Sequence, residues 1–277
     1  GPEIVAPGVV VAASDYLSAE QRERIRKRLV TWVSAQIEDA LERLMTLRKA
    51  DLSGVARGLA YQVVEGLGSL PRQRVIKEVR ELSKEDRSAL RACGIRIGAE
   101  TLFVPALVKP KAVQWRAMLW TLFTGRTTAP PPAAGLVTVP AGDDLPEDFL
   151  ESCGYSKLGG RAVRIDVLDR IAIDLQRQSR AGKMDIGAAQ LNLLGLSMDD
   201  ARPVFEALGY VADTVDEALV WKWAGRKKAH ADRPRKAGKG GKPGQKQNQK
   251  RERAKPKKPV PIDENSPFAK LKDLKFS

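Results

Sequence analysis

The sequence predicts a mainly α-helical protein with small β-hairpins, composed of a helical domain, a winged-helix-like second part and a disordered basic tail. Apolar residues recur every three or four positions through much of 18–124, which is the spacing of amphipathic helices. Three helical patterns and then two strand-like runs occupy 166–223, in the element order of a winged helix. From Gly225 onward the chain has almost no apolar content, so burial cannot offset the entropy of ordering it.

The chain is long enough for one large domain or two modest ones, with 277 residues of which 43% are hydrophobic. Its clearest boundary is a run of three consecutive prolines at 130–132, which favours a stiff extended linker. The expected parts are a helical domain at 1–128, a proline-rich linker at 129–135, a small α+β, winged-helix-like domain at 136–224, a disordered basic tail at 225–265 and a short amphipathic motif at 266–277.

The first helix is predicted over 18–49. Ser18 with Gln21 three residues later makes a capping box, and apolar residues then recur every four positions from Ile25 to Met45. Further helices are expected from Asp51 or Ser53, with Pro71 near the first turn of the next one. Ser83 and Asp86 are expected to cap a fourth helix, and a hairpin at 95–104 precedes a helix from Pro110.

The second part is predicted to begin with a strand at 136–139 and a short helix at 146–152. A pair of strands flanked by glycines follows over 154–165. The winged-helix-like elements are helices at 166–180, 186–194 and 197–208 and a hairpin of 210–212 with 218–223. The third of these helices begins with Asp199 and Asp200, whose charges would face phosphate, so we do not expect it to read a DNA groove.

Positive charge is concentrated in the tail and gives the strongest functional signal. Residues 226–258 hold 15 lysines and arginines against two acidic residues, a net charge of +13 out of +14 for the whole chain. Such a polycation displaces counterions from phosphates and binds RNA or DNA without sequence preference, although a solubilising tail without a partner is the alternative. The expected nucleic-acid contacts there are Arg226, Lys227, Lys228, Arg233, Arg235, Lys236, Lys250, Arg251, Arg253, Lys255, Lys257 and Lys258.

Cations also cluster at the start of the first helix, where Arg22 and Arg26 are candidate RNA contacts. A solvated helix face explains the same cluster without a ligand.

A second candidate is the Gly159-Gly160 pair, where Lys157, Arg161 and Arg164 could hold a phosphate against the backbone. A tight turn between two strands is the simpler interpretation of the two glycines.

No enzymatic motif is found. The chain has no phosphate-binding loop, and its one histidine, His230, lies in the tail, so a Ser-His-Asp or Cys-His system in the body is excluded. The carboxylates of Asp166, Asp169 and Asp174 are expected as caps and surface pairs. We therefore expect no catalytic residue, metal or cofactor in this chain.

The location and a protein-binding motif follow from the remaining features. Two lone cysteines, Cys93 and Cys153, and the lack of a signal peptide or an apolar membrane span predict a cytoplasmic protein without a membrane partner.

A candidate protein-binding motif lies near the end of the sequence. Phe268, Leu271 and Leu274 recur every third residue and could form a short helix that binds in a groove of a partner protein.

Several stretches, in the same order along nearly the whole chain, resemble the C-terminal region of large alphaproteobacterial DExH-box RNA helicases related to the mitochondrial degradosome helicase. These stretches are 17–22 (LSAEQR), 56–62 (ARGLAYQ), 102–110 (LFVPALVKP), 135–137 (GLV), 154–155 (GY), 159–164 (GGRAVR) and 262–271 (IDENSPFAKL).

The resemblance implies a non-catalytic accessory module of an ATP-dependent RNA helicase. The two ATPase cores of that family match nothing here, so ATP and Mg²⁺ are expected only on cores elsewhere in a parent protein. RNA is the expected partner, with DNA as the alternative, together with the helicase cores. The competing interpretation is an interaction scaffold that docks a ribonuclease, the cores or the ribosome.

Overall fold

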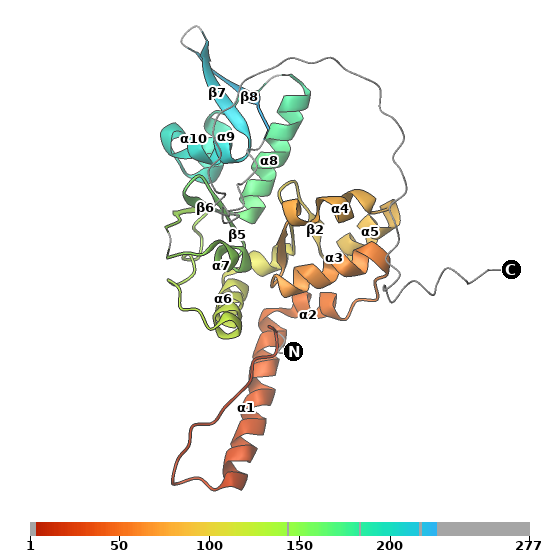
Figure 1. Ribbon diagram of the computed structural model, residues 1–277, viewed down its shortest axis with the longest axis vertical. Coiled ribbons are helices and arrows are strands. Elements are labelled where there is room, and N and C mark those ends of the chain that lie inside the picture. The colour runs from red at the N-terminus through yellow and green to blue at the C-terminus, as the bar shows by residue number, and fades with distance from the viewer. Residues whose placement is uncertain (1–3, 143, 183, 216–217, 226–277) are drawn as a thin grey trace, which may run out of the picture. The chain divides into compact units, whose positions relative to one another are not determined.

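The computed structural model describes residues 4–142, 144–182, 184–215 and 218–225, and over these residues the protein is mainly helical with small antiparallel sheets (Figure 1). This confirms the predicted class at that level. The basic tail and the motif of Phe268, Leu271 and Leu274 lie outside the described residues.

The predicted helix over 18–49 is in fact two helices, α1 (Ala19–Ala40) and α2 (Glu42–Arg48). Ser18 starts α1 with the predicted capping box, because its hydroxyl accepts from the Gln21 N–H and the Gln21 side chain accepts from the Ser18 N–H. The break lies at Leu41, which has φ −118° and ψ 30° and a fully buried side chain. The apolar repeat continues across the break, so periodicity alone predicted one helix.

A tight turn joins α3 (Gly54–Glu65) to strand β1 (Ser69–Pro71). Leu67 in this turn has φ 52°, a left-handed conformation that is rare for a residue with a side chain, and that side chain is fully buried. β1 pairs antiparallel with β3 (Thr101–Phe103), and β3 pairs with β2 (Arg96–Ile97). The predicted hairpin therefore has a third strand. Pro71 ends that strand and is also the N-cap of a 3₁₀ turn (Arg72–Val75) that leads directly into the next helix (Ile76–Glu81), so it lies near a helix start as predicted.

Helices and 3₁₀ turns lie between β1 and β2 and after β3 in the chain. The capping box of Ser83 and Asp86 starts α5 as predicted, and Gly125 ends α6 in the left-handed conformation that glycine adopts readily (φ 66°). The elements are the 3₁₀ turn η1 (Arg72–Val75), α4 (Ile76–Glu81), α5 (Lys84–Ala92), the 3₁₀ turn η2 (Pro105–Val108) and α6 (Pro110–Thr124).

After the proline-rich segment, a second sheet forms with β6 (Arg161–Arg164) at its centre, between β4 (Thr138–Pro140) and β5 (Tyr155–Leu158). α7 (Glu147–Ser152) lies between β4 and β5 in the chain and packs against α6 and β1. The chain then continues directly from β6 into a group of three helices and a hairpin, made of α8 (Ile165–Arg180), α9 (Ala188–Leu194), α10 (Met198–Ala207), β7 (Tyr210–Val215) and β8 (Ala218–Trp223).

The buried apolar residues form two clusters that meet at β6. Ala162 belongs to the larger cluster, which begins at Val5, and Val163 belongs to the smaller one, which ends at Trp221. Successive side chains of a strand point to opposite faces, so β6 supplies both cores. The division between the two cores therefore lies at β6 and not at the proline-rich segment 129–135. The domain limits that composition indicates remain predictions.

Asp169 attaches α8 to the turn between β2 and β3. Its carboxylate is buried, accepts a hydrogen bond from the Ala99 N–H at 2.6 Å, and lies 2.8 Å from Arg96 Nε. A side chain at Gly98 would overlap this carboxylate, so the turn requires glycine there.

We predict that Gly159→Ala destabilises the protein more than Gly160→Ala. Both glycines have positive φ (55° and 79°), so alanine at either one costs about 1–2 kcal/mol of backbone strain. A Cβ at Gly159 would also overlap the backbone of Pro203 in α10, whereas a Cβ at Gly160 meets nothing within 4 Å. Urea midpoints of the two variants measure the difference, and equal losses would contradict the packing of this turn against α10.

Candidate nucleic-acid interface

The start of α1 carries the densest group of cations that the structure describes. Arg26 pairs with Glu23 in the same helix through two hydrogen bonds of 2.8 Å, and the hydrogen bond from Arg26 lowers the pKa of Glu23. Arg22 is half-buried. Of the two predicted contacts on this helix, one is thus engaged by a carboxylate and the other is partly covered.

Arg24, Lys27 and Arg28 are better placed to meet a phosphate. All three are exposed and have no ion-pair partner among the residues that the structure describes. At about 100° per residue they fall on the side of α1 opposite to Leu29 and Val33. We call these three residues the α1 cationic face. The predicted cluster contains these three cations, but the contacts chosen from the sequence were Arg22 and Arg26.

α1 is exposed along most of its length (Figure 1). Ile37 is its one buried residue, and packing against α2 and α6 is confined to its later turns, where Asp39 pairs with Lys111 of α6. Four apolar side chains of its first turns remain open to solvent at 37–57% exposure, namely Ile25, Leu29, Val30 and Trp32. The cationic face therefore lies on an accessible helix.

The cations around the Gly159-Gly160 turn already have protein partners. Arg161 Nη2 lies 2.6 Å from Asp200, Arg164 pairs with Asp166 at 2.6 Å, and Lys157 Nζ donates to the carbonyl of Gly142 at 2.9 Å. Since Gly159 also packs against Pro203, these contacts favour the tight-turn interpretation over a phosphate site.

The three carboxylates of α8 are held by separate partners. Asp166 pairs with Arg164, and Asp169 with Arg96. Burial raises the pKa of Asp174, but hydrogen bonds from Gln190, Arg177 and Gln178 outweigh it, so its pKa is lowered overall. Within the described ranges, no group of three or more His, Cys, Asp or Glu side chains is arranged to hold a metal ion.

A fully buried arginine that sequence analysis did not single out, Arg116 of α6, lies where α6, η2, β1 and α7 meet. Its Nη1 donates to the carbonyl of Leu107 at 2.9 Å, and its Nη2 donates to Ser69 Oγ at 3.0 Å and to the Glu151 carbonyl at 3.3 Å. Burial lowers its pKa to about 10, so the guanidinium is charged at neutral pH. The same burial raises the pKa of the neighbouring Cys153 to about 11, which keeps it a thiol.

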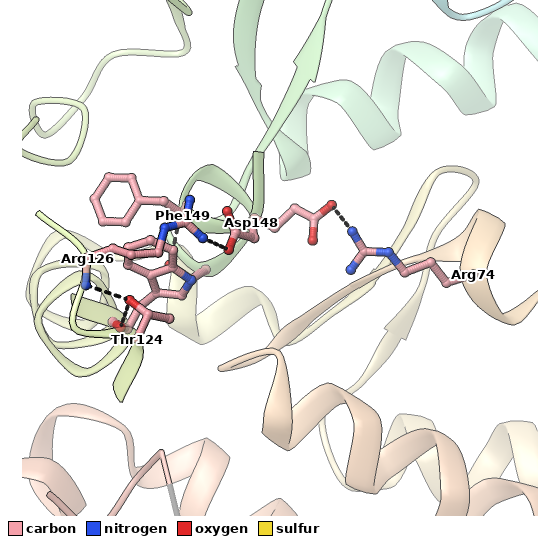
Figure 2. Close-up of polar contacts among 8 residues, drawn as sticks. Arg74, Thr124, Arg126, Asp148 and Phe149 are labelled. Atoms are coloured by element: carbon pink, nitrogen blue, oxygen red, sulfur yellow. Dashed lines mark hydrogen bonds and ion pairs between the residues drawn. The ribbon is translucent and has the colours of Figure 1, made fainter. Parts of the chain in front are cut away.

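Two carboxylates of α7 form ion pairs with arginines from other segments. Arg74 Nη2 lies 2.8 Å from Glu151 Oε1, and Arg126 Nη1 lies 2.7 Å from Asp148 Oδ2. Figure 2 shows Arg126 directed at Asp148. The guanidinium carbon of Arg126 also lies 4.8 Å from the centre of the Trp120 ring, a cation–π contact. These pairs neutralise the cations around α7 and leave little free positive charge there.

No protein-family model matches the chain, and no curated protein or solved structure matches it either. No helix within the described part of the chain is long and apolar enough to span a membrane.

We predict that Glu151→Gln gains stability relative to the unsubstituted protein as the pH rises from about 4 to about 7. Burial raises the pKa of Glu151 against the opposing effect of Arg74. A carboxyl group with a raised folded-state pKa favours folding when protonated, and that stabilisation is lost as the pH rises through the folded-state pKa. Glutamine keeps the neutral form at every pH.

Urea midpoints across this pH range measure the effect. Glu206→Gln removes a charge from an exposed position of α10, away from Glu151, and is the matched control. A Glu151→Gln variant that loses stability at neutral pH would show that the ion pair with Arg74 outweighs the burial of the carboxylate.

Proposed function

We propose that the chain is a non-catalytic RNA-binding accessory module of an ATP-dependent RNA helicase and that it acts in the cytoplasm. The observation that carries the proposal is the distribution of charge. The sequence places +13 in residues 226–258, while most cations around the second sheet and α7 are engaged by protein partners. The α1 cationic face adds three exposed charges on an accessible helix. The resemblance to helicase C-terminal regions supplies the connection to a helicase.

In this proposal the tail binds phosphates without regard to sequence and α1 adds contacts from the body. The part formed by α8, α9, α10, β7 and β8 is proposed to be winged-helix-like, because it has three helices followed by a hairpin. The start of its third helix, α10, is unsuited to contacting bases in a nucleic-acid groove, because Asp200 is negatively charged and pairs with Arg161. RNA held in this way would be presented to the ATPase cores of the parent protein, and DNA is the alternative ligand.

We predict that neutralising the tail removes most of the salt dependence of RNA binding. The variant replaces the twelve tail cations named in the sequence analysis by glutamine in the full chain. For single-stranded RNA, the slope of log K against log salt should become shallower by about 0.7 for each phosphate that the tail no longer neutralises. Fluorescence anisotropy with labelled RNA over a salt series measures it, and a slope equal to that of the unsubstituted chain would refute a role of the tail in binding.

We predict a smaller effect from the α1 cationic face. Arg24→Gln, Lys27→Gln and Arg28→Gln together should make the same slope shallower by about 2, because the helix then neutralises three fewer phosphates. Lys77→Gln, Arg80→Gln and Arg91→Gln remove three exposed cations from α4 and α5 and are the matched control. If both triple variants change the slope equally, the effect is one of net charge and α1 is not a specific contact.

The alternative function is an interaction scaffold. It is favoured by the exposed apolar side chains of α6, where Met118 and Leu122 are 43% and 60% exposed one turn apart, and by the C-terminal motif of Phe268, Leu271 and Leu274. In that case a ribonuclease, the helicase cores or a ribosomal surface would be the partner. A full chain that binds no RNA at low ionic strength would leave the scaffold as the function.

A further inference from the structure

A cavity of about 1020 Å³ lies between the end of α2, one face of α3 and the last turn of α6. It is far larger than the voids of a packed core, so it can admit a ligand group. Its apolar lining includes Ala60 and Val64 of α3 and Val5 of the N-terminal segment, all of which belong to the larger core. The cavity is therefore built on a packed and ordered floor.

Two aromatic rings from different helices line this cavity. Tyr61 of α3 is 63% exposed and Phe123 of α6 is 51% exposed. Exposed aromatic faces are the groups on which unpaired nucleobases stack, and such stacking tolerates any base. Duplex RNA cannot use them, because its bases are already stacked on one another.

Charges are ordered along the same wall. Arg57, Tyr61 and Glu65 follow one another at four-residue intervals on α3, so cation, aromatic ring and carboxylate form a row of about 12 Å. Lys49 also lines the cavity, and Asp51 adds a second carboxylate. The cations suit a phosphate, the rings suit a base, and the carboxylates suit hydrogen-bond donors such as base amino groups or a ribose hydroxyl.

We propose that this cavity holds an unpaired nucleotide of single-stranded RNA, with its base against Tyr61 and Phe123 and its phosphate near Arg57 and Lys49. This inference rests on the proposed RNA-binding function and adds a single-strand preference to it. The basic tail contacts phosphates of any nucleic acid, and the cavity selects strands whose bases are unpaired.

The experiment compares a short labelled oligoadenylate with the same strand paired to oligouridylate, both bound to the full chain. Tyr61→Ala and Phe123→Ala should each weaken binding of the single strand about tenfold, and leave binding of the duplex and the salt dependence unchanged. Tyr61→Trp, which keeps a stacking surface, should retain the affinity for the single strand. Tyr16→Ala removes a ring that is 94% exposed and lies outside the cavity, and it is the matched control.

Thermal melting of each variant checks that the fold is retained, which the exposure of both rings favours. Unchanged single-strand affinity in both alanine variants, with the unsubstituted chain still binding, would overturn the cavity assignment and leave the RNA-binding module standing. An equal loss for single strand and duplex would also overturn it, because stacking on unpaired bases cannot affect the duplex. An unsubstituted chain that binds neither RNA would overturn the proposed function itself.

Discussion

The buried guanidinium of Arg116 is the constraint on which the larger core depends. An arginine inside a protein usually meets a carboxylate, but the hydrogen bonds of this one go to the backbone carbonyls of Leu107 and Glu151 and to the hydroxyl of Ser69. Because the pKa of the group stays near 10, the charge persists at neutral pH and these neutral dipoles must solvate it. The three acceptors come from distant parts of the chain, so η2, β1 and α7 must all be in place before α6 can bury its arginine.

This requirement explains why the larger core includes elements from both sides of the proline-rich segment 129–135. α7 follows 129–135 in the chain, yet its backbone completes the arginine site together with β1 and η2. β6 then carries Ala162 toward one core and Val163 toward the other, and Asp169 of α8 is held by Arg96 and the Ala99 N–H. The part formed by α8, α9 and α10 is therefore attached through the shared strand β6 and the buried carboxylate of Asp169. Neither contact can be predicted from the composition of the proline-rich segment.

Structure that is determined by neighbouring residues could be predicted from the sequence, whereas structure that depends on distant contacts could not. The caps at Ser18 and Ser83 involve residues a few positions apart, and both were predicted. Strand β1 and the contacts of Arg116 with Ser69 and Glu151 depend on distant residues, and neither was foreseen. At the candidate interface, charge density located the start of α1, but its cationic face follows only from the phase of the helix, which the sequence also contains. The partner of Arg161 was harder to foresee, because Asp200 lies 39 residues away in the chain. The cavity at α3 carries no sequence motif, since its walls come from three separate helices.

The proposed contacts differ in their physical origin, and this determines what each contributes to binding. Contacts of the tail and α1 with phosphates gain free energy from counterion release, so they weaken as salt rises and apply to any nucleic acid. Stacking in the cavity is nearly independent of salt and requires an unpaired base. Because both are parts of one chain, capture of RNA by the tail would raise the local concentration of RNA at the body, so that even a weak stacking site would contribute. Under the proposed function the tail would supply most of the affinity, and the cavity would supply a preference for single strands.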